Sequence, residues 1–171
     1  MMQETGGSPI KDVAGYLPRD KIKLIINAAV DNRRDYVLLN TLALSGRRIS
    51  EIVGLREGKD EYGKYKRLDE PLGGLRPADL LEGNSVAWMI LKKRNRQRVV
   101  KAIPARLRRL LGNYIASREI PMDALVFPIT ARRVDQIIKK YAEKVGISRV
   151  GSRQMGCHVF RHSYAISLID K

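Results

Sequence analysis

The sequence predicts a mainly α-helical domain with one small antiparallel β-sheet, an α+β fold. Apolar residues recur at helical spacing in four separate stretches, near residues 18–30, 34–45, 105–119 and 130–145. Residues 84–104 instead form two apolar runs on either side of a polar turn, the pattern of a β-hairpin. With 171 residues, 44% of them hydrophobic, the chain is long enough to bury one core.

The helical stretches have recognisable boundaries. The first begins near Pro18, since proline is favoured in the first helical turn, and Asp31-Asn32 breaks it. Gly46 ends the second stretch and Gly146 the fourth, because glycine readily adopts the left-handed conformation that terminates a helix. The apolar faces of the four stretches comprise Ile22, Leu24, Ile25, Ile26, Ala29 and Val30; Val37, Leu38, Leu42 and Leu44; Leu107, Leu110, Leu111, Tyr114 and Ile115; and Val134, Ile137, Ile138, Tyr141 and Val145.

Three further segments show different patterns. Residues 45–55 are predicted to open a short helix with Ile49, Ile52, Val53 and Leu55 on its buried side. Residues 56–74 are charged and rich in glycine, with neither helical nor strand period, and are predicted to be an exposed loop. Residues 1–17 are expected to be a linker or a cloning remnant, which leaves residues 18–171 as the folded domain.

Net charge narrows the class of partner. The formal charge of +15 and the pI near 10.2 indicate a polyanion, most readily double-stranded DNA or another nucleic acid, with an anionic membrane surface as the alternative. No apolar run approaches the ~20 residues that span a bilayer, and no signal peptide is visible. A single cysteine, Cys157, is compatible with a reducing cytosol, so we expect a cytoplasmic protein without a membrane partner.

The first candidate site lies in the stretch GCHVFRHSYAISL, residues 156–168. His158 and Arg161 are three residues apart and would share one face of a helix, with His162 beside them. An imidazole handles protons near neutral pH, and a guanidinium grips phosphate oxygens with a planar fork of donors. The pair therefore suits a phosphodiester. His158 and His162 could also be a metal pair, but no third ligand is evident nearby, and we predict no metal and no cofactor.

Two upstream segments carry further candidates. Arg48 and Glu51 stand at the start of the short third helix, where Arg48 is either functional or simply a solvated arginine. Nine basic residues and no acidic one fall between Lys92 and Arg109. Such a one-sign block favours phosphate contacts over an ordinary solvated face. The predicted DNA-binding residues of the hairpin are Lys92, Arg94, Arg96 and Arg98.

Together these motifs resemble the signature of the tyrosine recombinase (phage integrase) family. His158-x-x-Arg161-His162 is similar to the family's His-x-x-Arg motif, and Ser45-Gly46-Arg47-Arg48-Ile49-Ser50-Glu51-Ile52 is similar to its Thr-Gly-Leu-Arg-x-Ser-Glu-Leu segment. Arg47 stands where the family has an apolar residue. The basic hairpin resembles the family's catalytic-lysine hairpin, with Lys92 and Arg94 in place of its flanking glycines.

The resemblance implies a set of roles. Arg48, Lys93, His158 and Arg161 would be catalytic, Glu51 and His162 would support them, and Arg98 would position the hairpin. The reaction would be site-specific recombination or integration of DNA, as in viral or plasmid genomes. Strands would be cut and rejoined through a 3′-phosphotyrosyl link, without a metal ion, by a synapse of four copies on double-stranded DNA.

One part of the family pattern is expected to be missing. In the family the nucleophilic tyrosine lies on a later helix, and an aromatic residue at the place of Tyr164 packs in the core. We therefore expect residues 18–171 to be a catalytic domain that lacks the nucleophile helix and the N-terminal DNA-clamping domain, and that binds DNA without cutting it. Two alternatives stay open: a non-catalytic basic module that binds nucleic acid, and a relaxing enzyme of the type IB topoisomerase kind.

Overall fold

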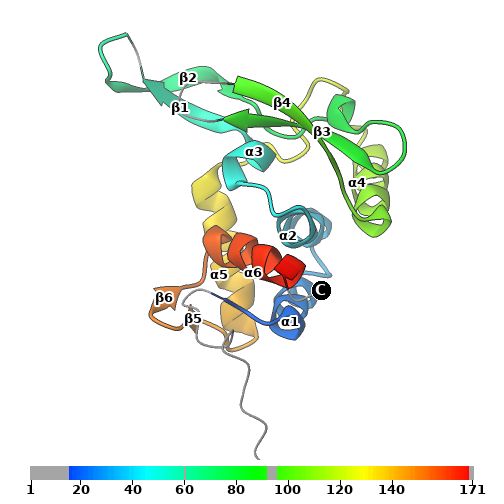
Figure 1. The fold of residues 1–171 in the computed structure, drawn as a ribbon, viewed down its shortest axis with the longest axis vertical. Coiled ribbons are helices and arrows are strands. Elements are labelled where there is room, and N and C mark those ends of the chain that lie inside the picture. The colour runs from blue at the N-terminus through cyan, green and yellow to red at the C-terminus, as the bar shows by residue number, and fades with distance from the viewer. Residues whose placement is uncertain (1–15, 60, 92–95, 170–171) are drawn as a thin grey trace, which may run out of the picture.

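The computed structural model describes residues 16–59, 61–91 and 96–169. A bundle of helices occupies one end of the molecule and two β-hairpins the other (Figure 1). The elements in chain order are α1 (Arg19–Ala28), α2 (Arg33–Ser45), α3 (Ile49–Val53), β1 (Leu55–Lys59), β2 (Tyr65–Leu72), η2 (Pro77–Asp79), β3 (Ser85–Leu91), β4 (Arg96–Ala102), α4 (Ala105–Ser117), α5 (Ala131–Lys144), β5 (Arg149–Val150), β6 (Arg153–Gln154) and α6 (Cys157–Ile169). The predicted α+β class is confirmed.

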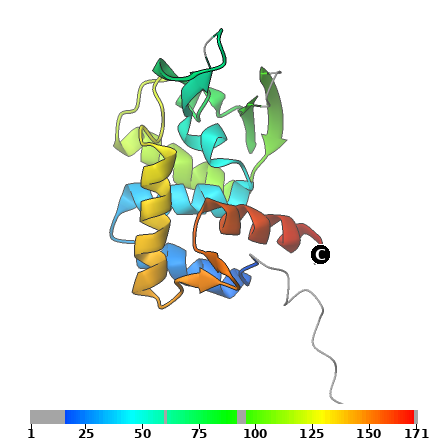
Figure 2. The same ribbon diagram turned by 90° about the vertical axis from the view of Figure 1, so that its left-hand side faces the viewer.

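Helix α2 lies at the centre of the bundle. It packs against α1, α4 and α6, and α5 stands across α1 and α6 (Figure 2). Its own sequence explains this position, because Val37, Leu38 and Leu39 are all fully buried and apolar side chains therefore project in several directions. Since α2 ends directly before the Arg47-Arg48 segment, the most buried helix of the domain supports one of the predicted motifs.

The predicted helix boundaries are largely confirmed. The Asn32 side chain caps α2 by accepting a hydrogen bond of 3.1 Å from the Asp35 amide. At the other end Gly46 takes the left-handed conformation, with φ +61°. Leu17, which we assigned to the linker, instead belongs to the core, because its side chain is buried and its amide donates to Ser163 Oγ at 3.0 Å.

The hairpin predicted over residues 84–104 is present as β3 and β4. The strands pair antiparallel, with Val86 opposite Lys101 and Trp88 opposite Val99. Val86 and Trp88 are buried, and β3 packs against α3. The tip at residues 92–95 lies outside the described residues.

The predicted exposed loop at residues 56–74 was wrong. This segment contains β1 and β2, an antiparallel hairpin that projects from the molecule (Figure 1). Glu57 lies opposite Arg67 and Lys59 opposite Tyr65, so the cross-strand pairs are largely polar. Nearly all side chains of the hairpin tip face solvent, and without a buried face there is no alternation of apolar and polar residues to detect.

The short helix predicted to open within residues 45–55 is present as α3, but Leu55, which we placed on its buried side, lies on β1 and is exposed. Helix α3 spans only Ile49–Val53 because glycines bound it on both sides. Gly46 and Gly54 both have positive φ, at +61° and +84°, which no continuous α-helix allows. Among the described residues, no helix combines the length and apolarity needed to cross a membrane.

Candidate active site

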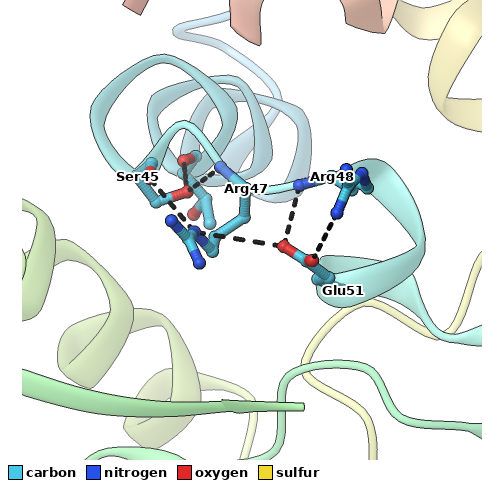
Figure 3. A network of polar contacts seen from close by, with 5 residues as sticks. Ser45, Arg47, Arg48 and Glu51 are labelled. Atoms are coloured by element: carbon cyan, nitrogen blue, oxygen red, sulfur yellow. Dashed lines mark hydrogen bonds and ion pairs between the residues drawn. The ribbon is translucent and has the colours of Figure 1, made fainter. Parts of the chain in front are cut away.

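The segment between α2 and α3 is organised around a buried carboxylate. The side chain of Glu51 is only 2% exposed. Its Oε2 accepts a hydrogen bond of 3.0 Å from the Arg48 amide, and its Oε1 lies 3.6 Å from Arg48 Nη1 (Figure 3). Half of the Arg48 side chain remains exposed. Glu51 therefore holds the backbone and the guanidinium of Arg48 while leaving part of that guanidinium open to a ligand.

Arg47 shares the same carboxylate. Its Nε lies 4.0 Å from Glu51 Oε2 and donates to the Ser45 carbonyl at 3.4 Å, so the side chain folds back toward the end of α2 (Figure 3). The sequence reasoning treated Arg47 only as a departure from the family pattern. The available signal was Glu51 in the first turn of α3, where a carboxylate can reach back to the residues that precede the helix.

Helix α6 carries the second motif and begins at a cap supplied by another helix. Asp135 of α5 accepts hydrogen bonds from the Cys157 amide at 3.1 Å and from Cys157 Sγ at 3.0 Å. Burial, together with this carboxylate, raises the pKa of the Cys157 thiol, which stays protonated and is no nucleophile at neutral pH. No pattern in the sequence predicts that Asp135 lies here, since the contact joins residues far apart in the chain.

The structure brings Arg161 close to the Arg48 segment. Burial lowers the pKa of the half-buried Arg161 guanidinium, and the positive charges of Arg48 and Arg47 lower it further, while Glu51 opposes them. The geometry agrees, because α6 packs against α2 and the ring of Tyr164, one turn after Arg161, contacts Gly46, two residues before Arg48. Arg47 and Arg48 share the one Glu51 carboxylate, and Arg161 adds a further positive charge. The cluster of Arg47, Arg48, Glu51 and Arg161 therefore carries an excess of positive charge and suits an anion with several oxygens, such as a phosphodiester.

The two histidines lie on the same helix with exposed side chains. His158 is one turn before Arg161, and His162 follows Arg161 directly. Neither side chain is buried in the core, so both are accessible to solvent. No group of three or more His, Cys, Asp or Glu side chains suited to a metal ion occurs in the part of the chain that is described.

The hairpin residues are only partly placed. Lys93, together with Lys92 and Arg94, lies outside the described residues, and Arg96 is described only by its backbone at the start of β4. Arg98 pairs with the buried Asp79, whose Oδ1 lies 2.7 Å from Arg98 Nη1. Asp79 also accepts from the Arg76 amide at 2.9 Å, so it ties β4 to η2. The Arg98 side chain is still 56% exposed.

Comparisons with known proteins extend this picture. No protein-family model matches the chain. A tyrosine recombinase from Pseudothermotoga lettingae is 25% identical over 163 residues, which cover 93% of this chain and 48% of that protein. The chain thus spans about half the length of the curated relative it matches.

Two solved structures share the fold. The XerA recombinase superposes with a TM-score of 0.63 at 21% identity, over 90% of this chain and 50% of that one. The XerH site-specific recombinase, in a pre-cleavage complex with its difH substrate, superposes with a TM-score of 0.59 at 15% identity, over 96% of this chain and 45% of that one. The chain is thus similar in sequence to a tyrosine recombinase and shares the α+β fold of the XerA and XerH recombinases.

Proposed function

We propose that this chain binds the phosphodiester of duplex DNA in the manner of a tyrosine recombinase catalytic domain, and that it serves site-specific recombination. The observation that carries the proposal is the packing of α6, which carries Arg161, against the end of α2, where Tyr164 contacts Gly46 just before Arg48 and its partner Glu51. Arg47, Arg48 and Arg161 together carry more positive charge than Glu51 balances, and an oxygen-rich anion would offset this excess.

In the chemistry of tyrosine recombinases, this cluster would stabilise the transition state of DNA cleavage. When a tyrosine hydroxyl attacks the phosphorus, the bond from phosphorus to the 5′-oxygen breaks and a 3′-phosphotyrosyl bond forms. Negative charge builds on the phosphate oxygens in the transition state, and Arg48 and Arg161 would stabilise it as donors held in place beforehand. Lys93 would protonate the leaving 5′-oxygen, and His158 would assist proton transfer.

Double-stranded DNA is the partner that the charge supports. The chain carries a net charge of +15, and the XerH recombinase with the same fold is bound to a difH substrate. Lysines and arginines along a duplex release condensed counterions, so binding of this type weakens steeply with salt.

We propose that none of the tyrosines of this chain is the nucleophile. Two are buried: Tyr114 stacks on Phe127 with ring centroids 5.8 Å apart, and Tyr141 donates to Asp35 at 2.9 Å. Tyr164, one turn after Arg161 on α6, packs against Gly46. The remaining four lie on the N-terminal segment, on α2 and on the β1–β2 hairpin, at Tyr16, Tyr36, Tyr62 and Tyr65.

The experiment is a binding and cleavage assay with end-labelled duplex DNA. We expect the affinity to fall by at least tenfold between low and moderate salt, and to fall again in Arg48→Ala and Arg161→Ala. On a denaturing gel we expect no covalent adduct. Affinity that is insensitive to salt would refute the DNA-binding proposal, and an adduct that disappears in Tyr164→Phe would identify Tyr164 as the nucleophile.

A further inference from the structure

Helix α6 must be held in one position for Arg161 to stay beside Arg48. Two of its anchoring contacts are polar. Asp135 caps its first turn through the Cys157 amide, and Ser163 Oγ accepts from the Leu17 amide at 3.0 Å while it donates to the Val159 carbonyl at 2.7 Å. These contacts tie α6 to α5 and to the segment before α1. Neither of them reaches the loop that carries Arg48.

A third contact does reach that loop. The ring of Tyr164 occupies the space beside Gly46, where a β-carbon would lie 2.1 Å from Tyr164 Cδ1 and 2.5 Å from Cε1. Real side chains cannot come so close, so only glycine fits under the ring. Gly46 also has φ +61°, a left-handed conformation that disfavours other residues. The end of α2 and the middle of α6 therefore touch at one closely packed point.

The contact between Tyr164 and Gly46 lies close in sequence to both arginines. Gly46 precedes Arg48 by two residues, and Tyr164 follows Arg161 by three residues, which places both side chains on one face of α6. A shift of the Tyr164 ring would move α6 against the Arg47-Arg48 segment, because the ring is the spacer between them. Densely packed contacts of this kind transmit small displacements rather than absorb them.

We propose that Tyr164 is a positioning residue, whose ring on Gly46 sets the separation between the Arg48 and Arg161 guanidiniums. The ring acts through its volume, and its hydroxyl takes no part. This inference rests on the proposed function in one respect: the separation matters because both guanidiniums are to grip one phosphate.

Two pairs of variants distinguish the effect of the Tyr164 ring from that of its hydroxyl and from backbone strain at a glycine. Tyr164→Phe keeps the ring and removes the hydroxyl, whereas Tyr164→Leu removes the ring. Gly46→Ala places a methyl group against the ring. Gly146→Ala is its control, because Gly146 also follows the end of a helix with positive φ, at +74°, but has no atom within 4 Å of the added carbon. The two glycine variants thus share backbone strain and differ in the contact.

The first readout is DNA affinity at fixed low salt, with a thermal unfolding curve for each variant to establish that it is folded. We expect Tyr164→Phe and Gly146→Ala to bind within about twofold of the parent chain, and Tyr164→Leu to bind about tenfold more weakly. In a background of Arg48→Ala with Arg161→Ala, the loss caused by Tyr164→Leu should vanish. An equal loss in both backgrounds, or an equal loss in Tyr164→Phe, would overturn the proposal.

The second readout needs no DNA and keeps the two proposals apart. The side-chain ¹⁵Nε resonances of Arg48 and Arg161 report on their surroundings. We expect Tyr164→Leu and Gly46→Ala to shift both resonances, and Tyr164→Phe and Gly146→Ala to leave them in place. Unshifted resonances in a folded Tyr164→Leu would refute the positioning role, whatever the DNA result. If the resonances shift but the arginine variants bind DNA normally, the positioning role stands and the proposed function fails.

Discussion

The arginine cluster and the β1–β2 hairpin are both rich in charge, yet they are built in opposite ways. In the cluster, Glu51 is buried and engaged by two arginines, and the Tyr164 ring of α6 packs on Gly46 beside them. In the hairpin, Glu57 and Arg67 face each other across two strands with both side chains exposed. The same residue types should therefore have large effects in one region and small effects in the other, because solvent screens exposed charges.

The largest expected difference concerns the two glutamates. Glu51→Gln removes the charge that faces Arg47 and Arg48, and we expect it to lower the free energy of unfolding by about 2–3 kcal/mol, since hydrogen bonds to charged groups are strong when one partner is buried. Glu57→Gln is the matched control, with an expected change below about 0.5 kcal/mol. Urea unfolding of both variants measures this. Equal changes in the free energy of unfolding for Glu51→Gln and Glu57→Gln would contradict the difference between the arginine cluster and the β1–β2 hairpin.

The next difference concerns two arginines and DNA. Arg161→Ala should weaken binding about tenfold, because a charge-assisted contact to phosphate is lost from a half-buried site. Arg67→Ala, on the exposed hairpin, should change the affinity by less than about twofold, because acidic residues neighbour it on β2. Fluorescence anisotropy at one fixed salt concentration compares them. A larger loss in Arg67→Ala would place the DNA on the hairpin instead.

The smallest difference concerns two tyrosines. Burial and the hydrogen bond to Asp35 raise the pKa of Tyr141 to about 12, from an ordinary value of 10. Because the folded-state pKa lies above the unfolded value of 10, the Tyr141 hydroxyl stabilises the fold fully below pH 10. This stabilisation is lost as the pH rises from 10 to 12. Tyr141→Phe should therefore cost about 1 kcal/mol at neutral pH, and less as the pH approaches 12. Tyr65→Phe, on the exposed hairpin, is the control.

Unfolding free energies at pH 8 and at pH 11.5 test the tyrosine prediction. The difference between the parent chain and Tyr141→Phe should shrink at the higher pH, whereas the difference for Tyr65→Phe should be near zero at both. A Tyr141→Phe effect that is independent of pH would show that the lost contact is packing rather than the hydrogen bond.

The same contrast explains which features the sequence could predict. Buried faces leave a periodic apolar pattern, so α2, α5 and the β3–β4 hairpin were found from residues such as Val37, Ile138 and Trp88. The β1–β2 hairpin buries no face and leaves no such pattern, so it was missed.

The site shows a similar division. Arg48 with Glu51, and His158 with Arg161, are local motifs that can be recognised in a single segment. The contacts that hold them join distant segments: Asp135 with Cys157, Asp79 with Arg98, and Tyr164 with Gly46. Short-range spacing carries no information about such pairs, and only the folded chain reveals them.

The central claim is that Arg48 and Arg161 act on one phosphate, and a double-mutant cycle of DNA affinity tests it most directly. The affinities of the parent chain, Arg48→Ala, Arg161→Ala and the double variant are measured at one salt concentration. We predict that the double variant loses less than the sum of the single losses, with a coupling of about 1 kcal/mol, because either substitution alone breaks the shared grip. Strictly additive losses would mean that the two arginines bind separately, and would contradict the account.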